Sequence, residues 1–153
     1  MAELIGGGSV TLVVRCNMSW DIIAQDLPKS ATSVEEIPDD FQPQPIGNRA
    51  QLIAQIRHVV PQADCTDPSW GIIEGDDWSI EVSTGDAEIC ESIAFHVRGG
   101  DGAIGAVATI LGELKLRAID CQSSEFFSAG PETLESFHTW RRYRDRVIDG
   151  NGT

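Results

Sequence analysis

Two neighbouring stretches in which apolar and polar residues alternate restrict the fold more than any other feature of the sequence. Residues 78–83 alternate in this way from Trp78 onward, and residues 92–98 alternate around Phe95. A period of two places one set of side chains on each face of a strand. The pattern therefore predicts two strands, each with one buried face, and Gly85 between them favours an antiparallel pair.

Amphipathic helices are expected on both sides of this pair of strands. Asn48 can cap a helix whose apolar residues, from Leu52 onward, recur at helical spacing until Pro61 ends it. Asp101 can cap a second helix, over residues 101–114, with one apolar stripe. Both helices can then cover the same face of a sheet.

The order of the expected elements predicts an α+β fold. With further strands near residues 20–25 and 116–121, the order is strand, helix, strand, strand, helix, strand. This is the order of a ferredoxin-like βαββαβ core, with a mostly antiparallel sheet and helices on one face, here followed by a C-terminal helix that begins at Pro131. The expected organisation is an extension or edge strand over residues 1–17, an α+β core domain over 18–127, and a C-terminal helix and tail over 128–153.

The chain is strongly acidic, and its charge is unevenly distributed. Eleven Lys and Arg stand against 24 Asp and Glu, a formal net charge of -13. No Lys or Arg occurs between residues 58 and 97, whereas arginines gather in the segment 141–146. This balance favours a basic protein partner and disfavours nucleic acid and anionic membrane surfaces.

Metal, redox and membrane functions are not expected. The four cysteines are widely separated, without a C-x-x-C pair or a histidine at zinc-ligand spacing. No apolar run approaches the length of a membrane helix, and Glu3 stands where a secretory signal would carry basic residues. We therefore expect no cofactor, no metal and a cytoplasmic location, and we make no prediction of the oligomeric state.

Acidic residues beside an aromatic residue form the main candidate site. The proline-rich segment 27–47 carries four acids close to Phe41, and two further acids follow Gly75. Acids around an aromatic anchor supply both electrostatic steering and a desolvated contact for a basic partner. The predicted partner-binding residues are Glu35, Glu36, Asp39, Asp40, Phe41, Asp76 and Asp77.

A glycine motif supports an alternative function. Gly100, Gly102 and Gly105 form a G-x-G-x-x-G pattern between an expected strand and a helix, and Asp120 follows 20 residues after Gly100. This spacing is typical of a dinucleotide or small-ligand site. Against it, Asp101 places a carboxylate where a pyrophosphate would need backbone N–H groups, and a tight strand-to-helix turn explains the same glycines.

Two other clusters of residues have simpler explanations than a functional site. A strand register that places Ser79 near His96 would gather serine, histidine and Glu81 on the open sheet face, although no oxyanion hole is indicated. The segment 140–144 interleaves arginines with aromatic residues, as a nucleic-acid patch does, but in so acidic a chain a helix whose arginines contact the protein's own acids explains it better. No catalytic residues are therefore predicted.

Four short segments resemble parts of small bacterial proteins. They begin at Met18, Gln25, Phe95 and Arg117 and read MSWDI, QDLP, FHVRGG and RAIDCQ. Some proteins of this kind accompany toxin genes as immunity proteins, so the resemblance implies an inhibitor of a toxin. Together with the charge, it predicts a non-enzymatic, acidic binding protein of immunity or antitoxin type that acts on a basic protein such as a toxin or nuclease.

Overall fold

A computed structural model describes residues 19–67, 69–128 and 130–151, so the expected extension over residues 1–17 lies outside the described residues. In chain order, the elements are β1 (Trp20–Gln25), the 3-10 helix η1 (Val34–Glu36), β2 (Gly47–Asn48), α2 (Arg49–Val59), β3 (Asp64–Asp67), β4 (Trp70–Glu74), β5 (Trp78–Ser83), β6 (Ile89–Cys90), β7 (Ser92–Gly99), α3 (Gly102–Leu114), β8 (Arg117–Asp120), β9 (Glu125–Phe126) and α4 (Pro131–Asn151).

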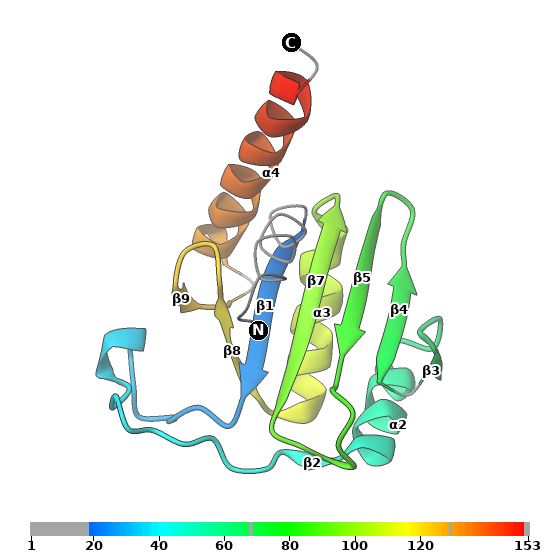
Figure 1. Cartoon of the computed structure of the whole chain (residues 1–153), viewed down its shortest axis with the longest axis vertical. Helices are drawn as coiled ribbons and strands as arrows, with labels where there is room; N and C mark the ends of the chain where they lie inside the picture. Colours follow the sequence, from blue (N-terminus) through cyan, green and yellow to red (C-terminus); the bar gives the residue numbers. More distant parts are fainter. Residues whose placement is uncertain (1–18, 68, 129, 152–153) are drawn as a thin grey trace.

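The molecule is an α+β protein built on one seven-stranded sheet (Figure 1). The strand order is β3-β4-β5-β7-β1-β8-β9, and every pairing of the described residues within this sheet is antiparallel. The sheet is thus larger than the four strands expected. A separate two-residue ladder joins β2 to β6.

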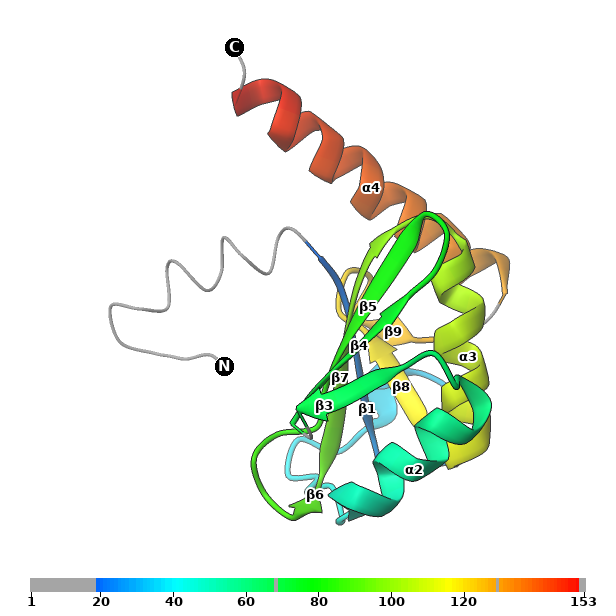
Figure 2. The ribbon, with the colours of Figure 1, turned by 90° about the vertical axis from the view of Figure 1, so that its right-hand side faces the viewer.

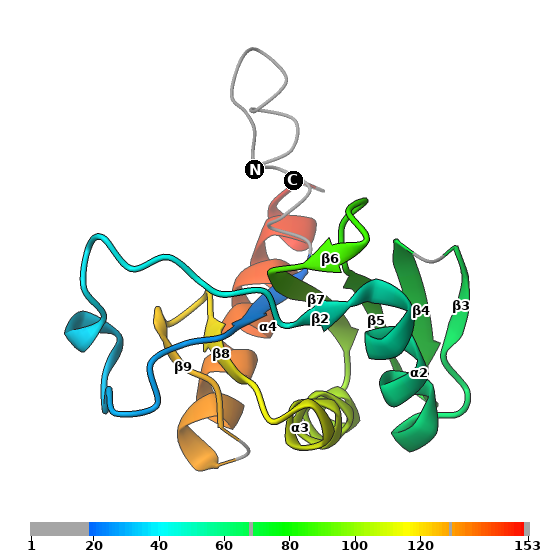
Figure 3. The same ribbon diagram turned by 90° about the horizontal axis from the view of Figure 1, so that it is seen from below.

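Helices α2 and α3 lie on the same side of the sheet, as the views from the side and from below show (Figures 2 and 3). The buried face of β1 carries Trp20, Ile22 and Ala24, at most 1% exposed. Phe95 of β7 and Val107 of α3 are fully buried in the same core. Because fully burying a large apolar side chain contributes about 1.5–3 kcal/mol, this layer supplies most of the driving force for the fold.

The predicted cap of α2 is confirmed. The Asn48 side-chain oxygen accepts hydrogen bonds from the backbone N–H groups of Ala50 at 2.9 Å and Gln51 at 3.4 Å. These bonds satisfy donors that the first turn of a helix leaves unpaired. The helix ends at Val59, two residues before Pro61.

The predicted C-terminal helix is also confirmed, and it packs on the core. Phe137 is fully buried and Trp140 is 3% exposed. The ring centroid of Phe137 lies 4.7 Å from that of Trp20 and 5.7 Å from that of Trp140. The first half of α4 is therefore anchored on β1, while its second half extends beyond the sheet (Figure 1).

Candidate functional site

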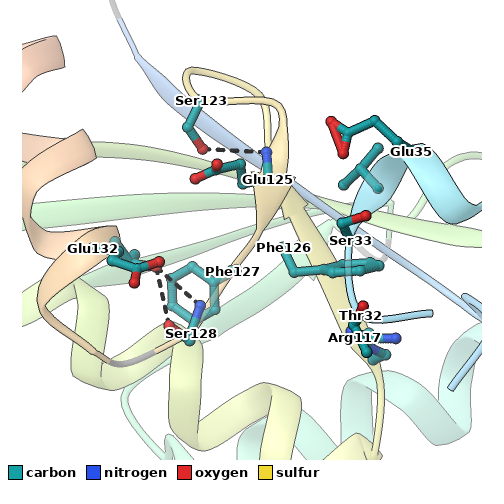
Figure 4. Close-up of a pocket in the computed structure, with 12 residues that line it drawn as sticks. Thr32, Ser33, Glu35, Arg117, Ser123, Glu125, Phe126, Phe127, Ser128 and Glu132 are labelled. Atoms are coloured by element: carbon teal, nitrogen blue, oxygen red, sulfur yellow. Dashed lines mark hydrogen bonds between the residues drawn. The ribbon is translucent and has the colours of Figure 1, made fainter. Parts of the chain in front are cut away.

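The candidate site is a cavity of about 380 Å³ at the β9 edge of the sheet (Figure 4). Three segments form it: residues 32–35 around η1, residues 117, 123 and 125–128 in and just after the β8–β9 hairpin, and residues 132–133 at the start of α4. Its wall contains three carboxylates, two phenylalanine rings and one guanidinium. These side chains belong to Glu35, Glu125, Glu132, Phe126, Phe127 and Arg117.

Hydrogen bonds at η1 fix one of the predicted acids, Glu36, and do not involve its neighbour Glu35. The Glu36 carboxylate accepts bonds from the Thr32 hydroxyl at 2.7 Å and from the Thr32 backbone N–H at 3.0 Å. These two bonds favour the charged form and lower the pKa of Glu36. Glu35 is exposed and lines the cavity, so it is the member of the predicted set that the site contains.

A buried aspartate shapes the β8–β9 hairpin. Asp120 is 1% exposed, and its Oδ1 accepts bonds from the Trp20 indole N–H and the Gln122 backbone N–H, both at 2.8 Å. Ser124 follows with a φ of 61° and donates its N–H to the Asp120 carbonyl at 2.8 Å. These bonds turn the chain so that Glu125 and Phe126 return along β8.

Arg117 is fixed beneath the aromatic wall of the cavity. Its Nη1 donates to the carbonyl oxygens of Pro28 at 2.6 Å and Ala31 at 2.9 Å. Its Cζ lies 3.6 Å from the centroid of the Phe126 ring, close enough for a cation–π contact. The positive group of the cavity is therefore already bound by this chain.

The remaining predicted acids do not join this cavity. Asp39 and Asp40 are exposed in the loop after η1, and Phe41 beside them is half-buried. Asp76 and Asp77 lie in the turn between β4 and β5, toward the opposite edge of the sheet (Figure 1). The predicted set therefore occupies two separate regions.

The sequence did not single out Glu125, Phe126 and Glu132, which complete the site. An acid followed by two phenylalanines, at residues 125–127, was the available signal. Nothing local indicates that this triplet lies beside η1, because about 90 residues separate the two segments.

Side chains of the β4–β5 turn fill the space beside the glycine motif. A Cβ at Gly100 would lie 2.7 Å from the Asp77 carboxyl carbon, and a Cβ at Gly102 would lie 2.6 Å from the Trp78 Nε1. The Gly100 N–H also donates to the Asp77 carbonyl at 2.8 Å. The absence of a Cβ at these glycines leaves room for Asp77 and Trp78. Asp120, the acid of the motif, is buried and hydrogen-bonded to Trp20. The contacts thus give the motif a structural role.

Asp101 does not cap α3 with its side chain, contrary to the expectation. Its carboxylate contacts α4 instead: Oδ1 accepts a bond from Arg141 Nη1 at 2.8 Å and lies 3.1 Å from His138 Nε2. A bond to a cation is stronger than one to a neutral backbone donor, and this difference favours the tertiary contact.

Replacing Gly105 with alanine is expected to stabilise the protein by about 1 kcal/mol, the difference between the two residues in a helix interior. Gly105 is exposed within α3, and no atom lies within 4 Å of a Cβ built there. The midpoint of urea unfolding should therefore rise, and Gly112→Ala, also exposed and open, should behave alike. A lower midpoint for both would contradict this account of the third glycine.

The open sheet face pairs differently from the register considered for Ser79 and His96. Glu81 lies opposite His96, and Ser79 lies opposite Arg98. His96 Nδ1 is 2.8 Å from Asp21 Oδ1, and its ring stacks on Trp70 with centroids 5.6 Å apart. The histidine is thus held between an acid and an aromatic ring, and Ser79, the serine considered for a triad, does not lie opposite it.

Three of the four arginines of α4 contact acids of the same chain. Arg141 pairs with Asp101, while Arg142 lies 3.5 Å from Glu135 and Arg144 lies 2.8 Å from Asp145.

Desolvation by burial raises the pKa of the Cys65 and Cys90 thiols, so both remain protonated near neutral pH.

Within residues 19–67, 69–128 and 130–151, no group of three or more His, Cys, Asp and Glu side chains could hold a metal ion. The helices of that same part of the chain are all too short or too polar to cross a membrane.

Comparisons with protein-family models, curated proteins and solved structures give no match to this chain.

Proposed function

We propose that this chain is a non-enzymatic binding protein whose acidic surface meets a basic protein, as an immunity or antitoxin-type inhibitor meets a toxin or nuclease. The observation that carries the proposal is the unequal neutralisation of its charges. Arg98 and the three arginines Arg141, Arg142 and Arg144 lie 2.8–3.5 Å from carboxylates of this chain. Four of the ten described Lys and Arg residues are thus neutralised by acids of the chain itself.

Most of the predicted partner-binding acids, by contrast, are not neutralised. Glu35, Asp39, Asp40 and Asp76 form no ion pair with any other described residue. Unpaired surface charge of one sign raises the encounter rate with a partner of opposite sign. The net charge of this chain is -13. This is more than solubility alone needs, since a net charge of about 2–8 suffices for a small domain.

The η1 end of the sheet is the better binding surface of the two acidic regions. There, Glu35 lies beside a cavity with aromatic walls, whereas Asp77 is packed against Gly100 in the β4–β5 turn. Binding energy concentrates where a desolvated aromatic contact lies within a polar rim. We therefore assign the partner surface to η1, the following loop and β9.

We also infer that β5, β7, β1 and β8, with α2 and α3, form a ferredoxin-like βαββαβ core. Their order in the sheet and their antiparallel pairing support this inference. On this view β3, β4 and β9 are additions at the two edges. The addition of β9 supplies Glu125 and Phe126 to the proposed binding surface.

Charge reversal at the η1 end is expected to weaken the complex with a basic partner by about tenfold or more, mainly through a slower association rate. Partners should be captured on the immobilised protein at low salt and identified, and their affinities then measured with purified proteins. The test variant is Glu35→Lys with Asp39→Lys. Its control is Glu74→Lys with Asp76→Lys, which changes the net charge equally at the other acidic region and should weaken binding less.

Two outcomes would contradict the proposed function. One is the recovery of no basic protein under conditions in which the bait remains folded. The other is a captured partner whose affinity is the same for the wild type and both charge-reversal variants at 50 mM and 150 mM salt, about the range over which surface charges become screened.

A further inference from the structure

The Phe126 ring at the β9 edge already binds one guanidinium. Arg117 lies on one side of the ring, with its Cζ 3.6 Å from the centroid. On the other side, residues Ser33 and Glu35 border the cavity, and Figure 4 shows the ring between them and Arg117. One face of the ring is therefore occupied by a cation, and the opposite face is directed toward the cavity.

The cavity is rich in hydrogen-bond acceptors. Glu35, Glu125 and Glu132 line it and are exposed, and none of their carboxylates accepts a hydrogen bond from a described residue. Ser33 adds a hydroxyl group beside them. The single cation in the wall, Arg117, is committed to the carbonyl oxygens of Pro28 and Ala31. A ligand for this cavity should therefore carry a positive charge, a planar group that can stack on the ring, and several N–H donors.

We infer that the cavity receives an arginine side chain of the basic partner. Its guanidinium stacks on the face of Phe126 opposite Arg117 and donates hydrogen bonds to Glu35 and Glu125. Five N–H donors in a planar fork suit both contacts, whereas a lysine ammonium is a compact, strongly hydrated charge that stacks less well. This inference rests on the proposed function and adds the chemistry of the side chain that the site selects.

The size of the cavity agrees with this ligand. A volume of about 380 Å³ accommodates one extended side chain together with some bridging water. It is at the small end of the range for pockets that enclose whole drug-sized ligands, about 300–1,000 Å³. One anchoring side chain from a larger partner therefore fits better than a complete small molecule.

The test uses three acetylated and amidated five-residue peptides, each with one central residue between glycines. The central residue is arginine, lysine or citrulline, the last being a neutral analogue of arginine with the same shape. Binding to the full, isotope-labelled chain is followed by NMR at low salt. We expect the arginine peptide to shift the amide signals of residues 32–35 and 123–128 and to bind about two- to fivefold more tightly than the lysine peptide. The citrulline peptide should bind at least tenfold more weakly than the arginine peptide, because it lacks the charge.

Variants separate stacking from charge. Phe126→Leu should abolish the preference for arginine over lysine, whereas Glu125→Gln should weaken both peptides while keeping the preference. Glu74→Gln, at an exposed acid of β4, is the matched control and should change neither. If Phe126→Leu disturbs the fold, as its amide spectrum would show, Glu125→Gln and the citrulline peptide still decide the question.

The failure of this inference is distinguishable from the failure of the proposed function. Equal affinity for arginine and lysine peptides, or shifts confined to residues outside the cavity, would overturn the arginine pocket even if a basic partner is captured through the acidic surface. Absence of peptide binding would overturn it as well. Failure to capture any basic protein would overturn the proposed function, whereas the peptide titrations would still show whether the cavity selects arginine.

Discussion

Replacing Phe137 with alanine is expected to lower the free energy of unfolding by about 3–5 kcal/mol, the usual cost of removing a fully buried phenylalanine. The ring is completely enclosed and stacks between Trp20 of β1 and Trp140 of α4. Alanine would leave a cavity that these two large, rigid rings cannot fill. Urea unfolding followed by circular dichroism and tryptophan fluorescence would measure the loss.

An exposed aromatic residue of the same helix provides the control. Tyr143 is 41% exposed, so Tyr143→Ala should change stability by no more than about 0.5 kcal/mol. If Phe137→Ala costs less than about 1 kcal/mol, α4 does not fold cooperatively with the sheet. The packing described for the C-terminal helix would then be wrong.

The strands and helices of the core could be predicted because their signals are local. Trp20, Ile22 and Ala24 alternate along β1, and Asn48 caps α2 from the adjoining position. The smaller strands gave no comparable signal. In β4, Ile72 is 40% exposed beside the fully buried Ile73, so apolar residues occupy both faces and the alternation disappears.

The register between β5 and β7 could not be predicted from the hairpin alone. β7 begins to pair with β1 at Ser92 but with β5 only at Ala94. In the observed register, Glu81 rather than Ser79 lies opposite His96. A pattern in one hairpin contains no information about a third strand.

The candidate site was predictable only in part, for a similar reason. The clustering of acids indicated Glu35, but the residues that complete the cavity belong to the β8–β9 hairpin and to the start of α4. Asp101 shows the same limit: local chemistry suggested a helix cap, whereas Arg141, 40 residues later, binds the carboxylate. Long-range contacts of this kind depend on the assembled fold.

Replacing Gly99 with alanine is expected to destabilise the protein by about 2–6 kcal/mol, because two costs add. Gly99 ends β7 with a φ of 96°, a conformation that costs about 1–3 kcal/mol for a residue with a Cβ. The new Cβ would also overlap the Asp77 carbonyl oxygen and lie 2.6 Å from the Trp78 Cα. Both are backbone atoms, so relief requires a shift of the β4–β5 turn, at about 1–3 kcal/mol more.

Gly85→Ala separates these two costs. Gly85 has a comparable φ of 81°, but no atom lies within 4 Å of a Cβ built there. Gly85→Ala should therefore show the backbone cost alone, and the difference between the two variants in urea unfolding measures the overlap with the turn. Equal losses of stability would mean that the turn can move at little cost, so that the packing of Asp77 and Trp78 does not require a glycine at position 99. A clearly larger loss for Gly99→Ala would instead show that the close approach of this turn, in addition to the backbone conformation, requires a glycine at the end of β7.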